Sequence, residues 1–312
     1  MANSDYPNRS SNYSGIWVPM ITPFKNGDVD YDAADLFTRH LVDAGVHGLV
    51  VCGTTGEGPS LSIFEKARLL DTVAASVPSH IPVFMGVEGA NTAQVITELS
   101  ELGDRSISGF LLAAPSYMRP SQEGIYRHFM AIADAVNKPV MLYDIPERTG
   151  VSISVDTIER LLENGAFPAI KACGLSADRL KSLIQLPNLE VMCGDDLWIH
   201  RAFELGAHGA ISASAQVLPR RFIETYSLIQ KIGIEPSWKR FSTLVPLIQH
   251  MFGEPNPAPV KAALASQGWC REELRLPMVP ITPSYREALN RVLRDMHALD
   301  HEELICADKS FK

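Results

Sequence analysis

Eight short, almost wholly apolar runs recur along residues 15–232, and segments with helical periodicity separate them. None of these runs alternates cleanly between apolar and polar positions, as expected of strands whose two faces are both covered. They lie near residues 16, 48, 81, 109, 138, 168, 189 and 208. Strands that alternate with helices in this way are typical of a parallel sheet built from βα units.

The segments between the runs read as amphipathic helices. Four of them carry apolar residues at i, i+3, i+4 and i+7, and cover residues 31–45, 62–77, 91–103 and 121–136. A repeat of about 25 to 30 residues, eight times over, favours a closed (β/α)8 TIM barrel. An open doubly wound sheet usually has fewer strands and a glycine-rich fingerprint after the first strand, and this chain lacks that fingerprint.

The rest of the chain predicts a helical extension of the barrel. Three further amphipathic segments cover residues 236–253, 256–268 and 284–299. We therefore expect four parts, which are a flexible N-terminal tail over 1–14, a barrel over 15–232, a C-terminal helical region over 233–299 and a C-terminal tail over 300–312.

Composition excludes several classes of protein. The 312 residues carry a net charge of −8 and no basic run, so neither nucleic acid nor an anionic membrane is an expected partner. No stretch approaches the roughly 18 apolar residues of a membrane span, and the polar first residues lack the core of a secretory signal. The five cysteines form no CxxC pair, which speaks against a disulfide framework or a structural zinc site. We expect a cytoplasmic protein.

The most informative residue for chemistry is Lys171, which lies inside an apolar run at a predicted strand end. Active residues of such barrels lie at the carboxyl ends of strands, and burial there favours the neutral amine, which can form a Schiff base with a ketone. The alternative is a lysine that extends to the rim or pairs with Asp195 or Asp196. Lys261 is a weaker candidate, because we expect it on a solvated helix face.

Two loops that follow predicted strands offer groups for binding and proton transfer. In GTTGEG, at 53–58, the N–H groups of Thr54 and Thr55 could hold a carboxylate, although a plain tight turn fits equally well. In YDIPERTG, Tyr143 could relay protons and Arg148 could bind a carboxylate. A buried tyrosine with a satisfied hydroxyl and an ordinary loop arginine are the alternatives. Tyr117 lies in a third loop, between two prolines.

A metal site is not expected. The nine histidines show no paired ligand spacing, and the adjacent carboxylates of Asp195 and Asp196 point in different directions with no third ligand nearby in sequence.

An ordered set of motifs spans about residues 15 to 297. The motifs are GTTGE, PSYMRPSQEGIYRHF, YDIPERTG, AIKACG, GDD, GAHGAIS, EPNPAPVKAAL and LRLPMVPIT. Together they resemble the dihydrodipicolinate synthase / N-acetylneuraminate lyase family of class I aldolases. The resemblance implies a (β/α)8 barrel with a C-terminal helical region, assembly as a homotetramer, and a lysine imine with pyruvate or another 2-oxo acid. It implies neither a metal nor an organic cofactor.

The resemblance also implies roles for single residues. Lys171 matches the Schiff-base lysine, Tyr143 the tyrosine that moves protons at the imine carbon, and Thr54 the hydroxyl that continues the relay. Thr55, with its neighbouring N–H, matches the group that binds the pyruvate carboxylate.

Four further positions complete the match to the family. Gly194 and Ile211 match positions whose backbone lines the pocket. Arg148 matches the arginine that binds the carboxylate of the second substrate in the synthases, and Tyr117 matches the tyrosine that reaches into a neighbouring subunit. Arg148 and Tyr117 favour the synthase branch over the neuraminate lyases.

The implied activity is the condensation of pyruvate with L-aspartate 4-semialdehyde to 4-hydroxy-tetrahydrodipicolinate, a step of lysine and diaminopimelate biosynthesis. Ser116, Met118 and Asp144 depart from the usual motifs, so a sister aldolase or dehydratase acting on a 4-hydroxy-2-oxo acid or a 2-keto-3-deoxy sugar acid is the alternative. A non-catalytic sensor of 2-oxo acids is a third. Because Ser116, Ile63 and Lys66 replace the family's lysine-binding residues, we expect weak or absent inhibition by lysine.

Overall fold

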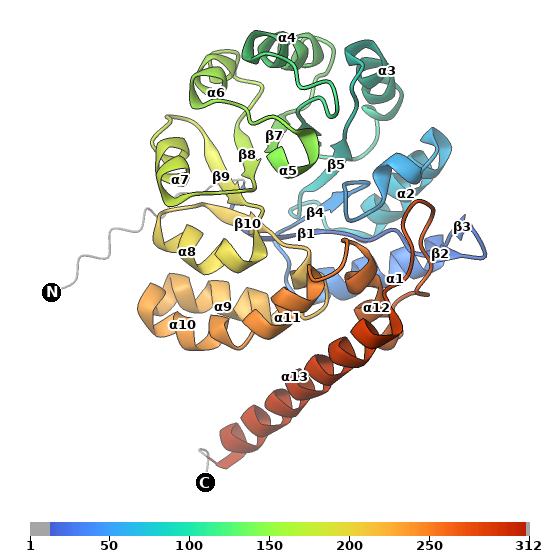
Figure 1. Cartoon of the computed structure of the whole chain (residues 1–312), viewed down its shortest axis with the longest axis vertical. Coiled ribbons are helices and arrows are strands. Elements are labelled where there is room, and N and C mark those ends of the chain that lie inside the picture. The colour runs from blue at the N-terminus through green and yellow to red at the C-terminus, as the bar shows by residue number, and fades with distance from the viewer. Residues whose placement is uncertain (1–12, 310–312) are drawn as a thin grey trace, which may run out of the picture.

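Eight parallel strands close into a barrel in the computed structural model, which describes residues 13–309 (Figure 1). The order around the barrel is β1-β10-β9-β8-β7-β6-β5-β4. Each of the eight apolar runs forms one of these strands, so the predicted TIM barrel is confirmed. The strands are β1 (Gly15–Pro19), β4 (Gly48–Val51), β5 (Val83–Val87), β6 (Gly109–Ala113), β7 (Val140–Asp144), β8 (Ala169–Ala172), β9 (Glu190–Cys193) and β10 (Gly209–Ile211).

Helices surround the strands and bury one face against them (Figure 1). In α1 the buried residues are Ala34, Phe37, Thr38 and Leu41, the spacing expected of a helix with one apolar face. Asp30 caps its first turn by accepting the Ala33 N–H at 3.1 Å. The barrel helices are α1 (Tyr31–Asp43), α2 (Ile63–Ser76), α3 (Thr92–Leu102), α4 (Gln122–Ala133), α5 (Pro146–Thr149), α6 (Val155–Leu162), α7 (Ala177–Ile184), α8 (Ile199–Glu204) and α9 (Pro219–Ile232).

Several short elements were not expected from the sequence. A two-stranded antiparallel hairpin, β2 (Phe24–Lys25) with β3 (Asp28–Val29), projects from the barrel after β1. Three 3-10 turns lie in loops that follow strands, and they are η1 (Gly58–Ser60), η2 (Asp196–Trp198) and η3 (Ser214–Gln216).

The inside of the barrel forms its own apolar cluster, separate from the layer between strands and helices. Trp17 and Phe84 pack there with ring centroids 5.3 Å apart. Tyr13 packs onto both rings, at 6.1 Å and 5.8 Å, and its N–H donates to the carboxylate of Glu190. The expectation of a loose tail up to residue 14 is therefore wrong at Tyr13, and residues 1–12 lie outside the described part of the chain.

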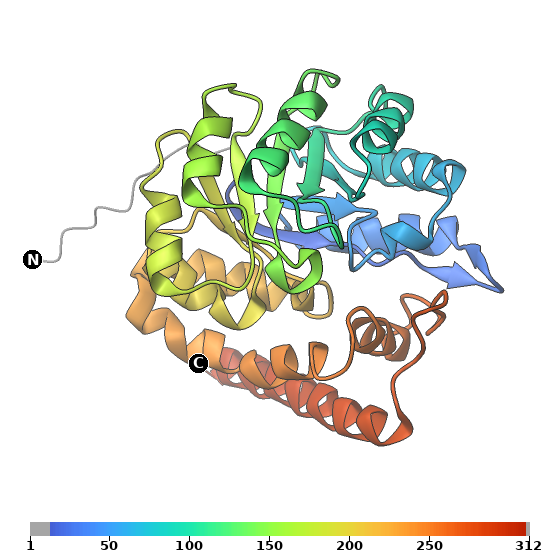
Figure 2. The ribbon, with the colours of Figure 1, turned by 45° about the horizontal axis from the view of Figure 1, so that its top comes forward.

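The C-terminal helices lie together along one side of the barrel (Figure 2). They are α10 (Ile234–Ser242), α11 (Val245–Met251), α12 (Ala258–Ser266) and α13 (Pro283–Lys309). The single helix expected over 236–253 is two helices, because Pro246 cannot donate the backbone hydrogen bond that would continue α10.

The last helix, α13, is anchored to the barrel. The side chain of Arg221, on α9, donates to the Met296 carbonyl at 2.9 Å. Because α13 continues to Lys309, the tail expected over 300–312 is wrong for residues 300–309, and 310–312 are outside the described residues. Within residues 13–309, no helix is long and apolar enough to cross a membrane.

Candidate active site

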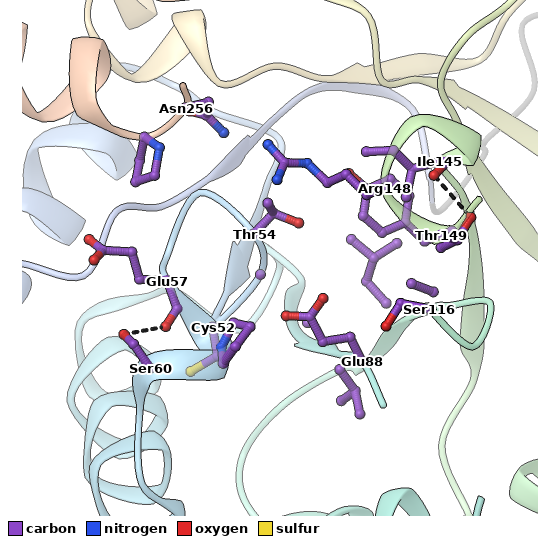
Figure 3. Close-up of a pocket in the computed structure, with 18 of the residues that line it drawn as sticks. Cys52, Thr54, Glu57, Ser60, Glu88, Ser116, Ile145, Arg148, Thr149 and Asn256 are labelled. Atoms are coloured by element: carbon purple, nitrogen blue, oxygen red, sulfur yellow. Dashed lines mark hydrogen bonds between the residues drawn. The ribbon is translucent and has the colours of Figure 1, made fainter. Parts of the chain in front are cut away.

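A cavity of about 390 Å³ opens at the carboxyl ends of β4 to β7. Its walls come from the loop after β4, the ends of β5, β6 and β7, and residues 256–257 and 275–278 of the C-terminal region. Figure 3 shows Thr54, Glu88, Ser116 and Arg148 around this space. Of the candidate catalytic and binding residues named from the sequence, Thr54, Tyr143 and Arg148 line the cavity.

Lys171 lies deeper, inside the barrel, and is not among the residues that line the cavity. It is paired in register with Tyr143 on the neighbouring strand, so both side chains point to the same face. The Lys171 Nζ lies 4.5 Å from the centroid of the Tyr143 ring, and only 7% of Lys171 is exposed. Tyr143 therefore connects the buried amine with the cavity above it.

The two carboxylates that could have formed an ion pair with Lys171 accept hydrogen bonds from backbone N–H groups. Asp196 is buried and accepts the Ser214 N–H at 2.7 Å, and Asp195 accepts the Leu175 N–H at 3.2 Å. Neither forms an ion pair with Lys171 among the described residues, although the charge of Lys171 opposes the rise that burial causes in the pKa of Asp196. In residues 13–309, no group of three or more His, Cys, Asp or Glu side chains has an arrangement that could hold a metal ion.

The phenol of Tyr143 belongs to a small polar group within the apolar interior. Burial raises its pKa well above the usual range, and a hydrogen bond with the Thr54 hydroxyl and the charge of Arg148 oppose the rise. Cys173, also buried, interacts with the same phenol, and burial raises the pKa of its thiol to about 12. The structure thus brings Tyr143, Thr54, Arg148 and Lys171 together.

Gly194 and Ile211 contribute backbone to this interior. A Cβ atom at position 194 would lie 2.9 Å from the Lys171 Cε and would also clash with the Cys173 sulfur, so only glycine leaves room for the lysine. Ile211 ends β10 and is 1% exposed within the interior cluster. Position 194 adjoins the Lys171 side chain, and neither Gly194 nor Ile211 lines the outer cavity.

The GTTGEG loop turns tightly and leaves backbone N–H groups available to a ligand. A Cβ at position 58 would clash with the carbonyl oxygen of Cys52, so Gly58 permits a close turn. In the described part of the chain, the N–H groups of Thr54 and Thr55 donate no hydrogen bond. These N–H groups are not part of the N-terminus of α2, because that helix begins at Ile63 after the 3-10 turn.

The Thr55 side chain is held by the C-terminal region. Its hydroxyl accepts a hydrogen bond from the Asn256 Nδ2 at 3.0 Å, and the residue is 4% exposed. The sequence did not single out Asn256, although its position directly before a proline in NPAPVK marks an unusual backbone.

Lys261 is not solvated, and the expectation that it lies on a solvated helix face is wrong. It is fully buried on α12, its Nζ is 2.5 Å from the Glu57 carboxylate, and it donates to the Glu273 carbonyl at 2.7 Å. Burial lowers the pKa of Lys261, and the charge of Glu57 opposes this. The signal was present, since this lysine interrupts an otherwise apolar helix.

Asp144 does not face the site. It is fully buried, pairs with Arg179 of α7, and accepts the Ile153 N–H at 3.0 Å. Because neighbours on a strand point to opposite faces, Tyr143 faces the interior and Asp144 faces the helices. The departure from the usual motifs at Asp144 therefore does not place a carboxylate beside the reacting groups.

Tyr117 stands away from the cavity. It is 91% exposed, adopts a left-handed backbone with φ of 68°, and is absent from the cavity walls. Its neighbour Ser116 does line the cavity.

Lys66 is paired with Glu98 at 2.6 Å, and the expected insensitivity to lysine stays a prediction.

Sequence reasoning missed several groups that line the cavity. Glu88 follows β5 and points into the space, and the segment Leu276, Pro277 and Met278 forms a wall from the far end of the chain. Glu88 could have been found as a charged residue directly after an apolar strand. The wall formed by residues 276–278 could not be predicted, because no local sequence pattern indicates that this segment packs against the barrel.

Comparison with known proteins agrees with this architecture. The model of the dihydrodipicolinate synthetase family matches residues 12–296. The chain is 35% identical over 285 residues to 4-hydroxy-tetrahydrodipicolinate synthase 2 of Clostridium acetobutylicum, covering 89% of this chain and 99% of that protein. It is 37% identical over 273 residues to the 4-hydroxy-tetrahydrodipicolinate synthase of Leptospira biflexa, covering 86% and 92%.

Solved structures show the same fold. The dihydrodipicolinate synthase of Thermotoga maritima superimposes with a TM-score of 0.89 at 30% identity, covering 91% of this chain and 99% of that one. The 4-hydroxy-tetrahydrodipicolinate synthase of Methylacidiphilum fumariolicum gives a TM-score of 0.87 at 37% identity, covering 90% and 95%. The barrel, its buried lysine and these matches over nearly the whole chain lead to one conclusion: the chain belongs to the dihydrodipicolinate synthetase family.

Proposed function

We propose that this protein is a lyase that condenses pyruvate with L-aspartate 4-semialdehyde to give 4-hydroxy-tetrahydrodipicolinate. The observation that carries the proposal is the buried amine of Lys171, in register with Tyr143 and 4.5 Å from the centroid of its ring. Two of the relatives bear the name of this synthase. No metal or organic cofactor is needed for the chemistry, because the lysine imine itself accepts the electron pair.

The first half of the reaction activates pyruvate. The neutral Lys171 amine attacks the ketone carbon, and loss of water gives the imine. Tyr143, kept protonated by its raised pKa, donates the proton that the departing hydroxyl needs. The phenolate left behind is a strong base, and it takes a methyl proton to form the enamine. The N–H groups of Thr54 and Thr55, unused within the described chain, hold the pyruvate carboxylate.

The second half joins the aldehyde. The enamine carbon attacks the aldehyde carbon of the semialdehyde, whose carboxylate binds the Arg148 guanidinium in the cavity. The amine of the substrate then displaces Lys171 from the imine carbon and closes the ring. Gly194 and Ile211 leave room for these steps through their backbones.

We further propose that the protein acts in the cytoplasm as a homotetramer in which Tyr117 reaches a neighbouring subunit. The 91% exposure of Tyr117 supports this, because an aromatic ring at a loop tip gains most from burial by a partner. Its hydroxyl would then extend the relay of Thr54 and Tyr143 from a second copy.

Trapping tests the imine directly. We expect sodium borohydride with pyruvate to leave a covalent adduct on Lys171, located by mass spectrometry of peptides. Lys171→Ala should show no adduct and no measurable turnover while it keeps the circular dichroism of the barrel, because one strand-end lysine supplies chemistry rather than core packing. An adduct elsewhere, or none in the unsubstituted protein, would rule out the mechanism.

The second substrate is tested by competition between reactions. We expect kcat/KM for pyruvate with L-aspartate 4-semialdehyde to exceed that for cleavage of 4-hydroxy-2-oxo acids and 2-keto-3-deoxy sugar acids by orders of magnitude. The opposite order would assign the chain to a sister aldolase that shares the same imine.

A further inference from the structure

Two opposite charges without partners face the same cavity. Glu88, after β5, and Arg148, on α5, both line it. Among the described residues, neither side chain forms an ion pair or a side-chain hydrogen bond. Figure 3 shows the Glu88 carboxylate directed into the space that the Arg148 guanidinium also faces.

The other charges near Glu88 are already matched. Lys66 of α2 lies in the vicinity, but its Nζ is paired with Glu98 of α3 at 2.6 Å. Solvent reaches Glu88 through the cavity mouth, yet the surrounding protein raises the pKa of its carboxyl, and the charges of Lys66 and Arg148 oppose the rise. Arg148 is thus the cation near Glu88 that is still available to bind a ligand.

The rest of this wall offers little to a charged ligand. Leu111, Ala113 and Ile145 present apolar surface, and Ser116 presents one hydroxyl. A carboxylate and a guanidinium that are held apart in a partly desolvated cavity match a ligand with its own separated positive and negative groups. An α-amino acid is such a ligand, because one molecule carries both an ammonium group for Glu88 and a carboxylate group for Arg148.

We propose that Glu88 binds the ammonium group of the second substrate and so selects an amino-acid aldehyde over aldehydes without the amine. This rests on the proposed function and adds a specificity residue to it. Arg148 holds the carboxylate of the aldehyde, and Glu88 holds its ammonium group until Glu88 accepts one proton from it and the neutral amine turns to the imine carbon. The pair orients the aldehyde carbon towards the enamine on Lys171.

The test compares two aldehydes that differ only in the amine, L-aspartate 4-semialdehyde and 4-oxobutanoate. We expect Glu88→Gln to lower kcat/KM for L-aspartate 4-semialdehyde by about 10- to 100-fold, mainly through KM, since a hydrogen bond between charged groups is lost. Turnover of 4-oxobutanoate, KM for pyruvate and borohydride trapping on Lys171 should stay unchanged.

A matched control is available beside the site. Glu147→Gln makes the same change at an exposed carboxylate next to Arg148 that does not line the cavity, and it should leave both aldehydes unaffected.

The outcomes separate the two proposals. An equal loss with both aldehydes, or no loss with either, would overturn the role of Glu88. A loss confined to a hydroxylated aldehyde such as glyceraldehyde would assign Glu88 to a hydroxyl group and overturn it too. If the unsubstituted protein traps pyruvate but does not turn over L-aspartate 4-semialdehyde, the proposed function itself fails.

Discussion

Proton transfer at the level of single residues depends on the Tyr143 phenol. Replacing it in Tyr143→Phe keeps the ring that packs on Lys171 and removes only the hydroxyl group. We expect kcat to fall by about 100- to 10,000-fold, the range typical of a lost general acid or base. Steady-state kinetics with pyruvate and the semialdehyde measures this.

Tyr126→Phe is the matched control. Tyr126 lies on α4 and does not line the cavity, and the Arg160 guanidinium packs over its ring. Since burial raises the pKa of Tyr143, its ionisation should add no alkaline limb to the pH profile of kcat below about pH 10. Full activity of Tyr143→Phe would show that another group carries the proton.

The reach of sequence reasoning differs between neighbouring residues. Lys171 and Tyr143 could be located because each ends an apolar run, and parallel strands bring such ends together. The partners of Asp144 and Lys261 could not be predicted, because Arg179 and Glu57 are brought close to them only by tertiary packing.

At the scale of elements, the buried pair of Lys261 and Glu57 joins α12 to the GTTGEG loop. Lys261→Met leaves the Glu57 carboxylate buried without its cation, and should lower the free energy of unfolding by about 3 to 5 kcal/mol. Urea unfolding followed by circular dichroism measures the change.

Two further variants make that measurement specific. Lys239→Met, at an exposed site on α10, should change stability by less than about 0.5 kcal/mol. Adding Glu57→Gln to Lys261→Met should recover part of the loss, because the amide can still accept the Arg275 N–H without a buried charge. Equal stability of Lys261→Met and Lys239→Met would contradict the assignment.

The elements that could be predicted from the sequence are those long enough to show an apolar periodicity. The eight strands and the barrel helices carry clear apolar patterns over several residues, such as that of α1. The hairpin of β2 and β3 has two residues in each strand, too few for any pattern. Pro246 indicates the break between α10 and α11, although the apolar periodicity around it predicts one continuous helix.

At the scale of the whole molecule, the loop after β6 carries apolar side chains outward. Tyr117 is 91% exposed and Met118 is 66% exposed. If this loop docks into a second subunit, Met118→Asp should weaken assembly, because a carboxylate would be buried in the contact. Sedimentation velocity over a range of concentrations should show smaller species, and activity should fall where they form.

Lys239→Met serves again as the control, and its assembly should match that of the unsubstituted protein. Unchanged assembly of Met118→Asp would place the subunit contact elsewhere on the surface. The sequence could suggest this contact only through the family resemblance, because exposure of a side chain is a property of the folded chain.

The cavity wall built from Leu276, Pro277 and Met278 has a consequence for the order in which the protein becomes functional. All eight strands are complete at Ile211, and the last barrel helix ends at Ile232. A chain that ends before Arg275 contains every strand of the barrel, together with Lys171 and Tyr143, but it lacks one side of the cavity. The side of the cavity that shields the enamine from water is therefore the last part of the site to be synthesised.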